Sequence, residues 1–227
     1  MGRSIGELDQ NNLLISPKYR VSHWVKARDS ENWDEMVKIF RDRIESRYLK
    51  PVRLISNDNE LGEFSGFSIL AIDCLIIETL NQFYNGHDET VGEHRSAFWK
   101  FFKQSEHFKN HFSRKKAYTF YSHYRCGILH QAQTKAKSVV RIGEKEMIQT
   151  VTNIVSDGLI VDRSKFHEAL EDEISLYIQK LKNGDGILRT NFVVKMNMIR
   201  GLKPNKANSR AQLNPNLWDS TKEVDET

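Results

Sequence analysis

The stretch FSGFSILAIDCLIIETLNQFYNG, residues 64–86, decides the fold of this chain. It is apolar on nearly every face at helical spacing, so it predicts a helix at the centre of a bundle. Asn85-Gly86 marks its end, because glycine readily adopts the left-handed conformation that closes many helices. Asp73 and Glu78 interrupt the apolar run, and a carboxylate is unfavourable to bury without a partner.

Amphipathic segments on both sides of this stretch predict the rest of the bundle. Apolar residues recur at spacings of three and four in 32–49, and Pro51 is expected to end that helix. Thr90 and Glu93 can form a capping box that starts the next helix. The remaining helices are expected at 94–108, from Ser113 through the basic segment, and within 156–184, where the last helix places its core face on Phe166, Leu170, Ile174, Tyr177 and Leu181.

The fold class predicted is mainly α, a bundle of four to five helices with a small β-hairpin before the last helix. Alternating apolar residues in 138–155 predict that hairpin. Residues 1–202 are expected to form a single helical domain whose first 31 residues are irregular. The polar composition of 203–227 predicts a tail outside the domain.

The composition favours a soluble protein of a reducing compartment. The longest apolar run, 67–80, is shorter than the roughly 20 residues of a membrane span, and the N-terminus lacks the pattern of a signal peptide. Cys74 and Cys126 lie in apolar surroundings and predict small core residues. No Gly-rich phosphate loop, zinc-type cysteine spacing or compact acidic cluster occurs. We therefore expect a cytoplasmic protein that uses no metal or cofactor and contacts no membrane.

One segment of the chain is strongly basic. Between Trp99 and Arg141 there are ten Lys or Arg residues and one acid, Glu106, whereas the whole chain has a net charge of only +4. Nine of the 23 aromatic residues lie in the same window. Cations bind phosphates and aromatic rings stack on bases, so this segment predicts a nucleic-acid site. A solvated basic face over aromatic core residues explains the same pattern.

The motif YRCGILHQ, residues 124–131, holds the candidate catalytic pair, Arg125 and His130. An imidazole exchanges a proton near neutral pH, and a guanidinium clamps a phosphate with two hydrogen bonds. Together they suffice for RNA cleavage without a metal, in which a base deprotonates the ribose 2′-OH and that oxygen attacks the adjacent phosphate. DNA, which has no 2′-OH, is expected to be spared.

The spacing of the pair leaves a second interpretation open. Five residues of a regular helix turn by about 140° and rise by about 7.5 Å, so the two side chains do not share one face. The reach of arginine, a distortion at Gly127 or a second subunit can reconcile them. In the alternative, Arg125 pairs with an acid such as Asp73 or Glu78, and His130 is a satisfied interior histidine.

The motif resembles the active-site motif of HEPN-domain proteins, an arginine followed by four to six residues and a histidine. AIDCLIIETLNQFYNG, SAFWKFF and FYSHYRCGILHQAQTK extend the resemblance, to a group of uncharacterised bacterial HEPN-like proteins, over about residues 60 to 140. It implies that His130 is the base and that Arg125 holds the scissile phosphate in a homodimer. It also implies a toxin or antiviral effector, often accompanied by an antitoxin. Cys126 stands where such proteins frequently have a polar residue.

Neighbouring residues complete the predicted site. Tyr121 can stack on a base or position a phosphate, and Asp73 or Glu78 can orient the catalytic pair or serve the bundle structurally. Cys126 is expected to support the site. A solvated face is the competing interpretation for the residues expected to contact RNA, which are Lys115, Lys116, Gln131, Lys135 and Lys137.

Overall fold

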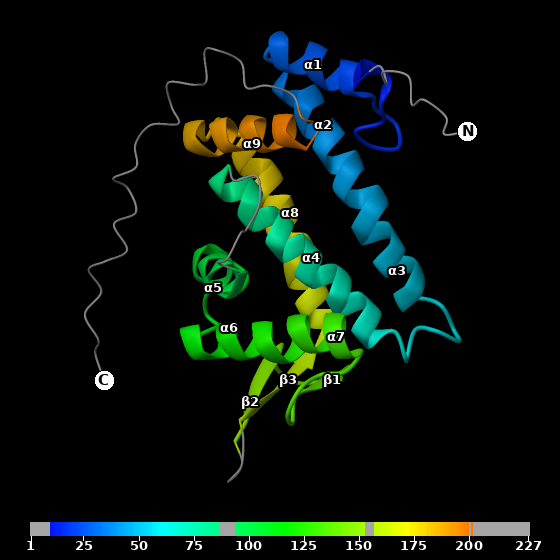
Figure 1. Ribbon diagram of the computed structural model, residues 1–227, viewed down its shortest axis with the longest axis vertical. Helices are drawn as coiled ribbons and strands as arrows, with labels where there is room; N and C mark the ends of the chain where they lie inside the picture. The colour runs from blue at the N-terminus through cyan, green and yellow to red at the C-terminus, as the bar shows by residue number, and fades with distance from the viewer. Residues whose placement is uncertain (1–9, 87–93, 153–156, 200, 202–227) are drawn as a thin grey trace, which may run out of the picture.

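A computed structural model describes residues 10–86, 94–152, 157–199 and 201. It is mainly helical, with seven continuous helices and a small three-stranded sheet at one end (Figure 1). The predicted mainly α class is confirmed. Residues 203–227 and the proposed capping box at 90–93 lie outside the described residues.

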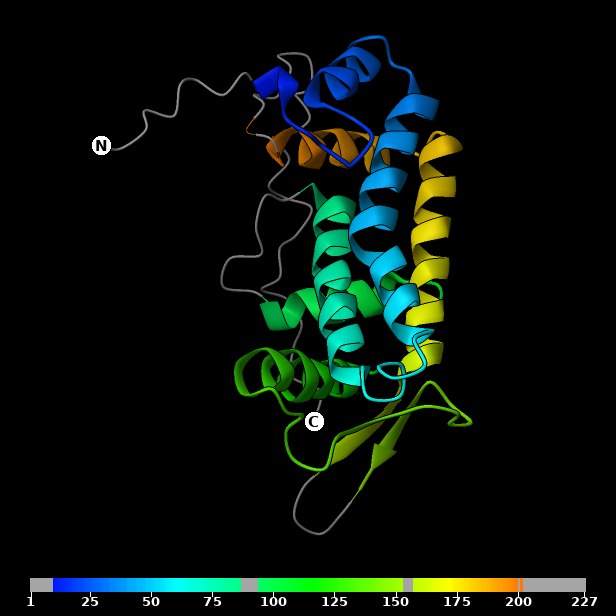
Figure 2. The same ribbon diagram turned by 90° about the vertical axis from the view of Figure 1, so that its right-hand side faces the viewer.

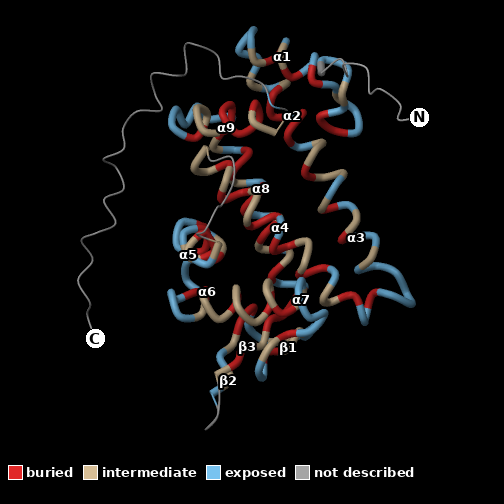
Figure 3. Tube along the Cα trace, viewed as in Figure 1, coloured by how far each residue is buried: buried red, intermediate tan, exposed pale blue. Residues whose placement is uncertain are grey.

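The central helix, α4 (Gly66–Asn85), forms where the apolar stretch predicts it and ends at Gly86, whose φ is 64°. It runs beside α8 (Arg163–Lys182), and all five predicted core residues of α8 are buried. The buried residues follow the inner sides of these helices (Figure 3). Helix α4 is long and apolar enough to cross a membrane by length and composition alone, and half of its most apolar 18-residue window is buried inside the protein.

The first long helix does not end at Pro51. A helix α2 (Trp33–Ile44) continues through a π-helical turn, η2 (Glu45–Leu49), into α3 (Lys50–Ser56). In the π turn the amide of Lys50 donates to the carbonyl of Glu45, five residues back. Pro51 follows in the first turn of α3, where a missing N–H is tolerated. The predicted stop is wrong because the hydrogen-bond register widens just before the proline.

The first 31 residues are not irregular throughout, because α1 (Val21–Asp29) is a helix. Its Trp24 is fully buried and donates from Nε1 to Oδ1 of Asn197, 2.9 Å away, in α9 (Gly186–Met198). Helix α9 was not predicted from the sequence either. Both helices cover the same end of the bundle (Figure 2), and their stability comes from this mutual packing more than from local pattern.

Two further continuous helices carry the basic segment. Helix α5 (His94–Gln104) is shorter than predicted. Helix α6 (Arg114–Phe120) begins next to Ser113, as predicted, and Ser113 caps it by accepting from the amide of Lys116 at 3.3 Å. Helix α6 then continues through a second π turn, η3 (Tyr121–Arg125), into α7 (Cys126–Gln131). The α6–η3–α7 segment is named the basic rod below.

The small sheet has a different topology from the predicted hairpin. Strands β1 (Val139–Arg141) and β2 (Ile148–Val151) do not pair with each other, because β3 (Gly158–Asp162) lies between them. Strand β1 is parallel to β3, and β2 is antiparallel to it. The turn expected at the start of 156–184 is thus the central strand, whose almost wholly buried residues are typical of that position. The hairpin prediction is wrong in its pairing.

Candidate functional site

Arg125 and His130 lie at different positions of the basic rod. Arg125 is the last residue of the π turn η3, and His130 lies in the last turn of α7. Among the described residues no hydrogen bond, ion pair or ring contact joins the two side chains. A single chain therefore does not bring the predicted pair together.

Glu78 of α4 holds Arg125. The Nε of Arg125 donates to Oε1 of Glu78 at 2.9 Å, and the two side chains are 18% and 20% exposed. Burial lowers the pKa of Arg125, but the hydrogen bond and charge of Glu78 outweigh it, so the pKa lies above its ordinary value. The guanidinium is thus a permanent cation fixed through Nε. Within the described part of the chain, its two terminal nitrogen atoms make no hydrogen bond.

Two more of the predicted supporting residues surround Arg125. The Cζ of Arg125 lies 5.7 Å from the centroid of the Tyr121 ring, which itself packs on Phe98 at 5.3 Å. Burial, followed by a side-chain hydrogen bond with Cys126, raises the pKa of Tyr121 above its ordinary value. Tyr121 therefore stays a neutral phenol that supports the guanidinium. Cys126 is partly exposed, so it is not the core residue expected.

His130 is exposed at the end of the basic rod. Within the described ranges it makes no side-chain hydrogen bond, and the backbone turns into the left-handed conformation at Ala132, whose φ is 52°. The alternative of a satisfied interior histidine is therefore wrong. The alternative of an Arg125–acid pair is confirmed, and the acid is Glu78.

Asp73 does not support Arg125 or His130. It is fully buried, and its Oδ1 lies 2.7 Å from Nδ1 of His167 in α8. Burial acts to lower the pKa of His167, but the hydrogen bond and charge of Asp73 outweigh it, with help from Glu171, so this pKa is raised above its ordinary value. Sequence reasoning missed His167, although the need of a buried carboxylate for a partner was the available signal.

The residues predicted to contact RNA divide into two sets. Lys115 and Lys116 belong to α6, where Lys115 pairs with Asp157 at 2.6 Å and Nζ of Lys116 approaches the carbonyl of His111. Gln131 ends α7, and Lys135 and Lys137 follow it. The rod between the two sets is roughly 25 Å long at 1.5 Å per residue. One compact contact surface does not include both sets.

A groove between α5 and α6, named the α5–α6 groove below, was missed by sequence reasoning. Its volume is about 530 Å³. It adjoins the basic rod at the end opposite His130. The spacing of four residues between its α6 members was the signal that could have found it. Its lining includes Arg95, Arg114, Lys115, Tyr118, Thr119 and Ser122.

An exposed apolar patch flanks the Arg125–Glu78 pair. Leu75 is 45% exposed and precedes Glu78 by three residues on α4, and Leu129 is 50% exposed and follows Arg125 by four residues on the basic rod. Residues three or four apart lie on the same side of a helix. Each member of the ion pair therefore shares one side of its helix with an exposed leucine.

No protein-family model, curated protein or solved structure matches this chain. Within residues 10–86, 94–152 and 157–199, no three His, Cys, Asp or Glu side chains are grouped so as to hold a metal ion.

Proposed function

We propose that this protein is a HEPN-like endoribonuclease that cleaves RNA without a metal and works as a homodimer. The observation that carries the proposal is the state of the two candidate side chains. Arg125 is held through Nε by Glu78, its side chain is 18% exposed, and its terminal nitrogen atoms make no hydrogen bond among the described residues, while His130 is exposed on the same rod. A guanidinium with a free fork suits a phosphate, and a solvated imidazole suits proton transfer.

The proposed reaction uses only these groups. The imidazole of His130 removes the proton of a ribose 2′-OH, and the 2′-oxygen forms a bond to the adjacent phosphorus. The bond from phosphorus to the 5′-oxygen breaks, and that oxygen takes a proton from the imidazolium. Arg125 binds the non-bridging oxygens as negative charge develops on them. The products are a 2′,3′-cyclic phosphate and a 5′-hydroxyl.

A second copy of the chain can supply the histidine that a single chain does not bring close to Arg125. About 140° of helix rotation separates Arg125 from His130 within a protomer. In a two-fold interface each patch meets its own copy, so Arg125 of one protomer can approach His130 of the other. The exposed leucines at 75 and 129 provide apolar area to bury at such an interface.

The test is incubation of the purified protein with single-stranded RNA in EDTA. We expect cleavage with cyclic phosphate ends, and His130→Ala is expected to reduce the rate about 10²- to 10⁴-fold. His111→Ala, which removes another exposed histidine of the basic segment, is the matched control and should cleave normally. Equal, undetectable cleavage by wild type and His130→Ala, at concentrations where the protein is dimeric, would contradict the proposal.

A non-catalytic nucleic-acid-binding or protein-interaction module is the second candidate function. The observation that favours it is that Glu78 already compensates the charge of Arg125. This function requires salt-dependent RNA binding with no product, and Arg125→Ala should then lower affinity only. A gel shift at two salt concentrations, run beside the cleavage assay, separates the two.

The cellular role we propose is that of a toxin or antiviral effector, with an antitoxin or defence-system protein as partner. The resemblance to HEPN proteins supports this role. Inducible expression in bacteria tests it, because wild type should arrest growth and His130→Ala should not. Arrest by both proteins, or by neither, would contradict a role that depends on cleavage.

A further inference from the structure

The loop that joins α3 to α4, residues 57–65, is named the acidic loop below. Its acids are Asp58, Glu60 and Glu63, and it contains no Lys or Arg. All three acids are exposed, and in the described part of the chain none of them makes an ion pair. Phe64 of the same loop is 83% exposed. An aromatic residue with charges around it is typical of the centre and rim of a protein interface.

Hydrogen bonds hold the acidic loop in a defined shape. The Oδ1 of Asp58 accepts from two amides of the loop, at 2.9 Å and 2.8 Å. The buried Arg163, at the start of α8, donates to Oγ of Ser65 at 2.9 Å and to the carbonyl of Gly62. A Cβ on Gly62 would lie 2.5 Å from the carbonyl oxygen of Asp58, so this close turn admits only glycine. Because the loop is ordered beforehand, it loses little conformational entropy when it binds.

A second segment, residues 129–142, has the opposite charge and is named the 129–142 segment below. It contains no acid, and its cations are Lys135, Lys137 and Arg141. Within the described ranges none of these cations makes an ion pair. The first and last residues of the segment, Leu129 and Ile142, are 50% and 53% exposed. The segment therefore offers exposed apolar side chains together with uncompensated positive charge.

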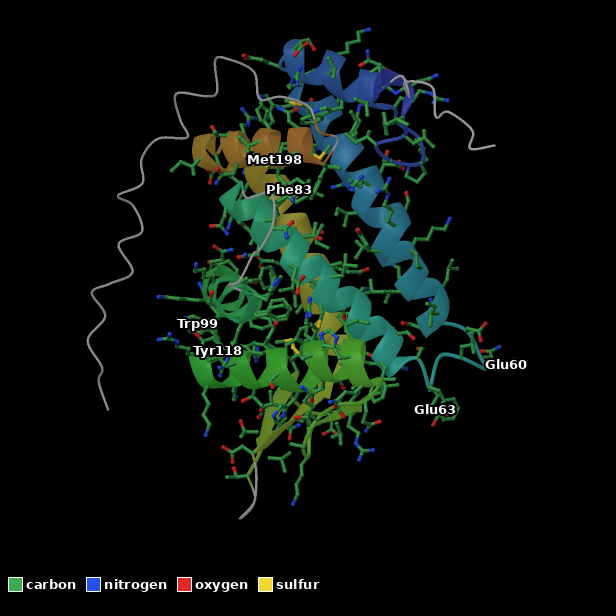
Figure 4. All side chains as sticks on the ribbon, viewed as in Figure 1. Glu60, Glu63, Phe83, Trp99, Tyr118 and Met198 are labelled. Atoms are coloured by element: carbon green, nitrogen blue, oxygen red, sulfur yellow. The ribbon has the colours of Figure 1, made fainter. Side chains whose placement is uncertain are left out.

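The two segments lie at the same end of α4. A Cβ on Gly66, the first residue of α4, would lie 2.9 Å from Cγ1 of Val140, so the acidic loop enters α4 beside the 129–142 segment. Figure 4 shows Glu60 and Glu63 projecting from the bundle at this end. Among the described residues no ion pair joins the two segments. Their opposite charges are therefore not paired with each other within one chain.

We propose that the acidic loop of one protomer binds the 129–142 segment of a second copy of this chain. Three acids and three cations on one molecule make this end self-complementary. Because both segments adjoin the start of α4, a two-fold rotation forms the same contact twice and closes the dimer. Phe64 is the apolar anchor of each contact, and the acids and cations around it pair across the interface.

This contact continues the interface of the proposed nuclease. Leu129 belongs both to the 129–142 segment and to the exposed patch beside Arg125, so the acidic loop extends the surface that brings Arg125 toward His130 of the partner. The inference rests on the proposed homodimer but not on RNA cleavage. It assigns Lys137 to the interface instead of to RNA.

The experiment measures the dimer dissociation constant of the full chain by analytical ultracentrifugation. One variant reverses the loop, Glu60→Lys with Glu63→Lys, and a second reverses the segment, Lys137→Glu with Arg141→Glu. Each variant places like charges at both contacts of its own homodimer, so its dissociation constant should rise at least about tenfold. When one variant is labelled and mixed with the other, opposite charges meet at both contacts. The mixed dimer should form with a dissociation constant within about threefold of the wild-type value.

Two matched controls separate this contact from general effects of charge and exposure. Glu168→Lys with Asp172→Lys makes the same change of charge at two exposed acids of α8 and should alter the dissociation constant less than about threefold. Phe64→Ser should raise the dissociation constant about fivefold or more. Ile187→Ser, at a 79% exposed residue of α9, which packs on the opposite end of α4, should leave it within about twofold. Circular dichroism confirms that each variant is folded.

The outcomes distinguish this contact from the proposed nuclease activity. A dimer that both reversed variants leave unchanged, or a mixture that associates no more tightly than either variant alone, would overturn the contact and leave the nuclease proposal standing. A dimer that responds as expected but cleaves no RNA would support the contact and contradict the nuclease proposal. A wild-type protein that is monomeric at every concentration tested would overturn both.

Discussion

Asp73 and Glu78 are two acids on one helix, five residues apart, and the structure uses them in opposite ways. Asp73 faces the interior and pairs with His167 of α8, whereas Glu78 lies near the surface and pairs with Arg125 of the basic rod. From the sequence the two are equivalent candidates. The comparison shows that depth below the surface, more than residue type, separates an acid that stabilises the fold from one that positions a cation.

The inner pair belongs to a longer network. The Nε2 of His167 lies 3.5 Å from Glu171, whose Oε1 accepts from Nε of Arg53 at 2.8 Å. Arg53 also pairs with Glu45 at 2.5 Å. The network thereby links α4 and α8 to the π turn η2 and to α3. Among the described residues, the outer pair has no such continuation.

The largest effect is expected from breaking the inner pair. Asp73→Ala leaves His167 without its partner in the interior and should lower the free energy of unfolding by about 3–5 kcal/mol. Urea unfolding followed by circular dichroism measures it. Asp73→Asn keeps the shape of the side chain and one hydrogen bond, so it should lower the free energy of unfolding by a smaller amount. A loss below about 1 kcal/mol for Asp73→Ala, within the range of an exposed ion pair, would remove the contrast between the two acids.

The inner pair should also make stability depend on pH. Because the pKa of His167 is raised in the folded protein, its contribution is complete below the unfolded value of about 6.5 and is lost as the pH rises through the folded value. Each unit of difference between the two values corresponds to about 1.4 kcal/mol. Unfolding free energies measured across this range should fall with rising pH in wild type and fall less steeply in Asp73→Asn. A wild-type stability that rises with pH over this range would contradict the assignment.

Breaking the outer pair should affect activity more than stability. Glu78→Gln removes a partly exposed ion pair and should lower the free energy of unfolding by about 1 kcal/mol or less. Loss of the orientation of Arg125 should nevertheless reduce RNA cleavage about tenfold or more. Arg125→Lys keeps the positive charge but lacks the paired N–H donors of the guanidinium, and it should reduce RNA cleavage about as much as Glu78→Gln does. Normal cleavage by both variants would show that Glu78 does not position a functional cation.

The smallest effect on stability is expected beside the outer pair. Leu129→Ser replaces an exposed leucine and should change the free energy of unfolding by less than about 0.5 kcal/mol. If the patch is the dimer interface, the same change should shift the protein toward monomer in analytical ultracentrifugation. Ile187→Ser, at the 79% exposed isoleucine of α9, is the matched control and should leave the oligomeric state unchanged. Identical sedimentation of wild type and Leu129→Ser would exclude the patch as that interface.

Periodic segments were predictable because their signal is local. The positions of α4 and the core face of α8 follow from spacing alone, and the start of α6 near Ser113 was predicted as well. Segments whose partners are distant were not predictable in this way. Helix α1 depends on a contact between Trp24 and Asn197, and the pairing of β1 with β3 joins strands separated by β2 in the sequence.

The candidate site shows the same difference between features set by local sequence and features set by contacts between distant segments. YRCGILHQ identified Arg125 and His130 as chemically capable residues, and the Arg125–acid pair was foreseen as an alternative. The choice of Glu78, the diversion of Asp73 to His167 and the groove around Tyr118 depend on which helices meet. Spacing along one helix carries no information about the neighbouring helix.

The sequence by itself determined the mainly helical class, the central helix and the concentration of positive charge between Trp99 and Arg141, because periodicity and charge are properties of neighbouring residues. Only the tertiary structure decided which acid lies inside, which cation is held at the surface and where the basic helices enclose a groove. Ion pairing joins residues that are far apart in the sequence, 94 positions for Asp73 and His167 and 118 for Arg53 and Glu171, and these energies exist only once the helices have packed.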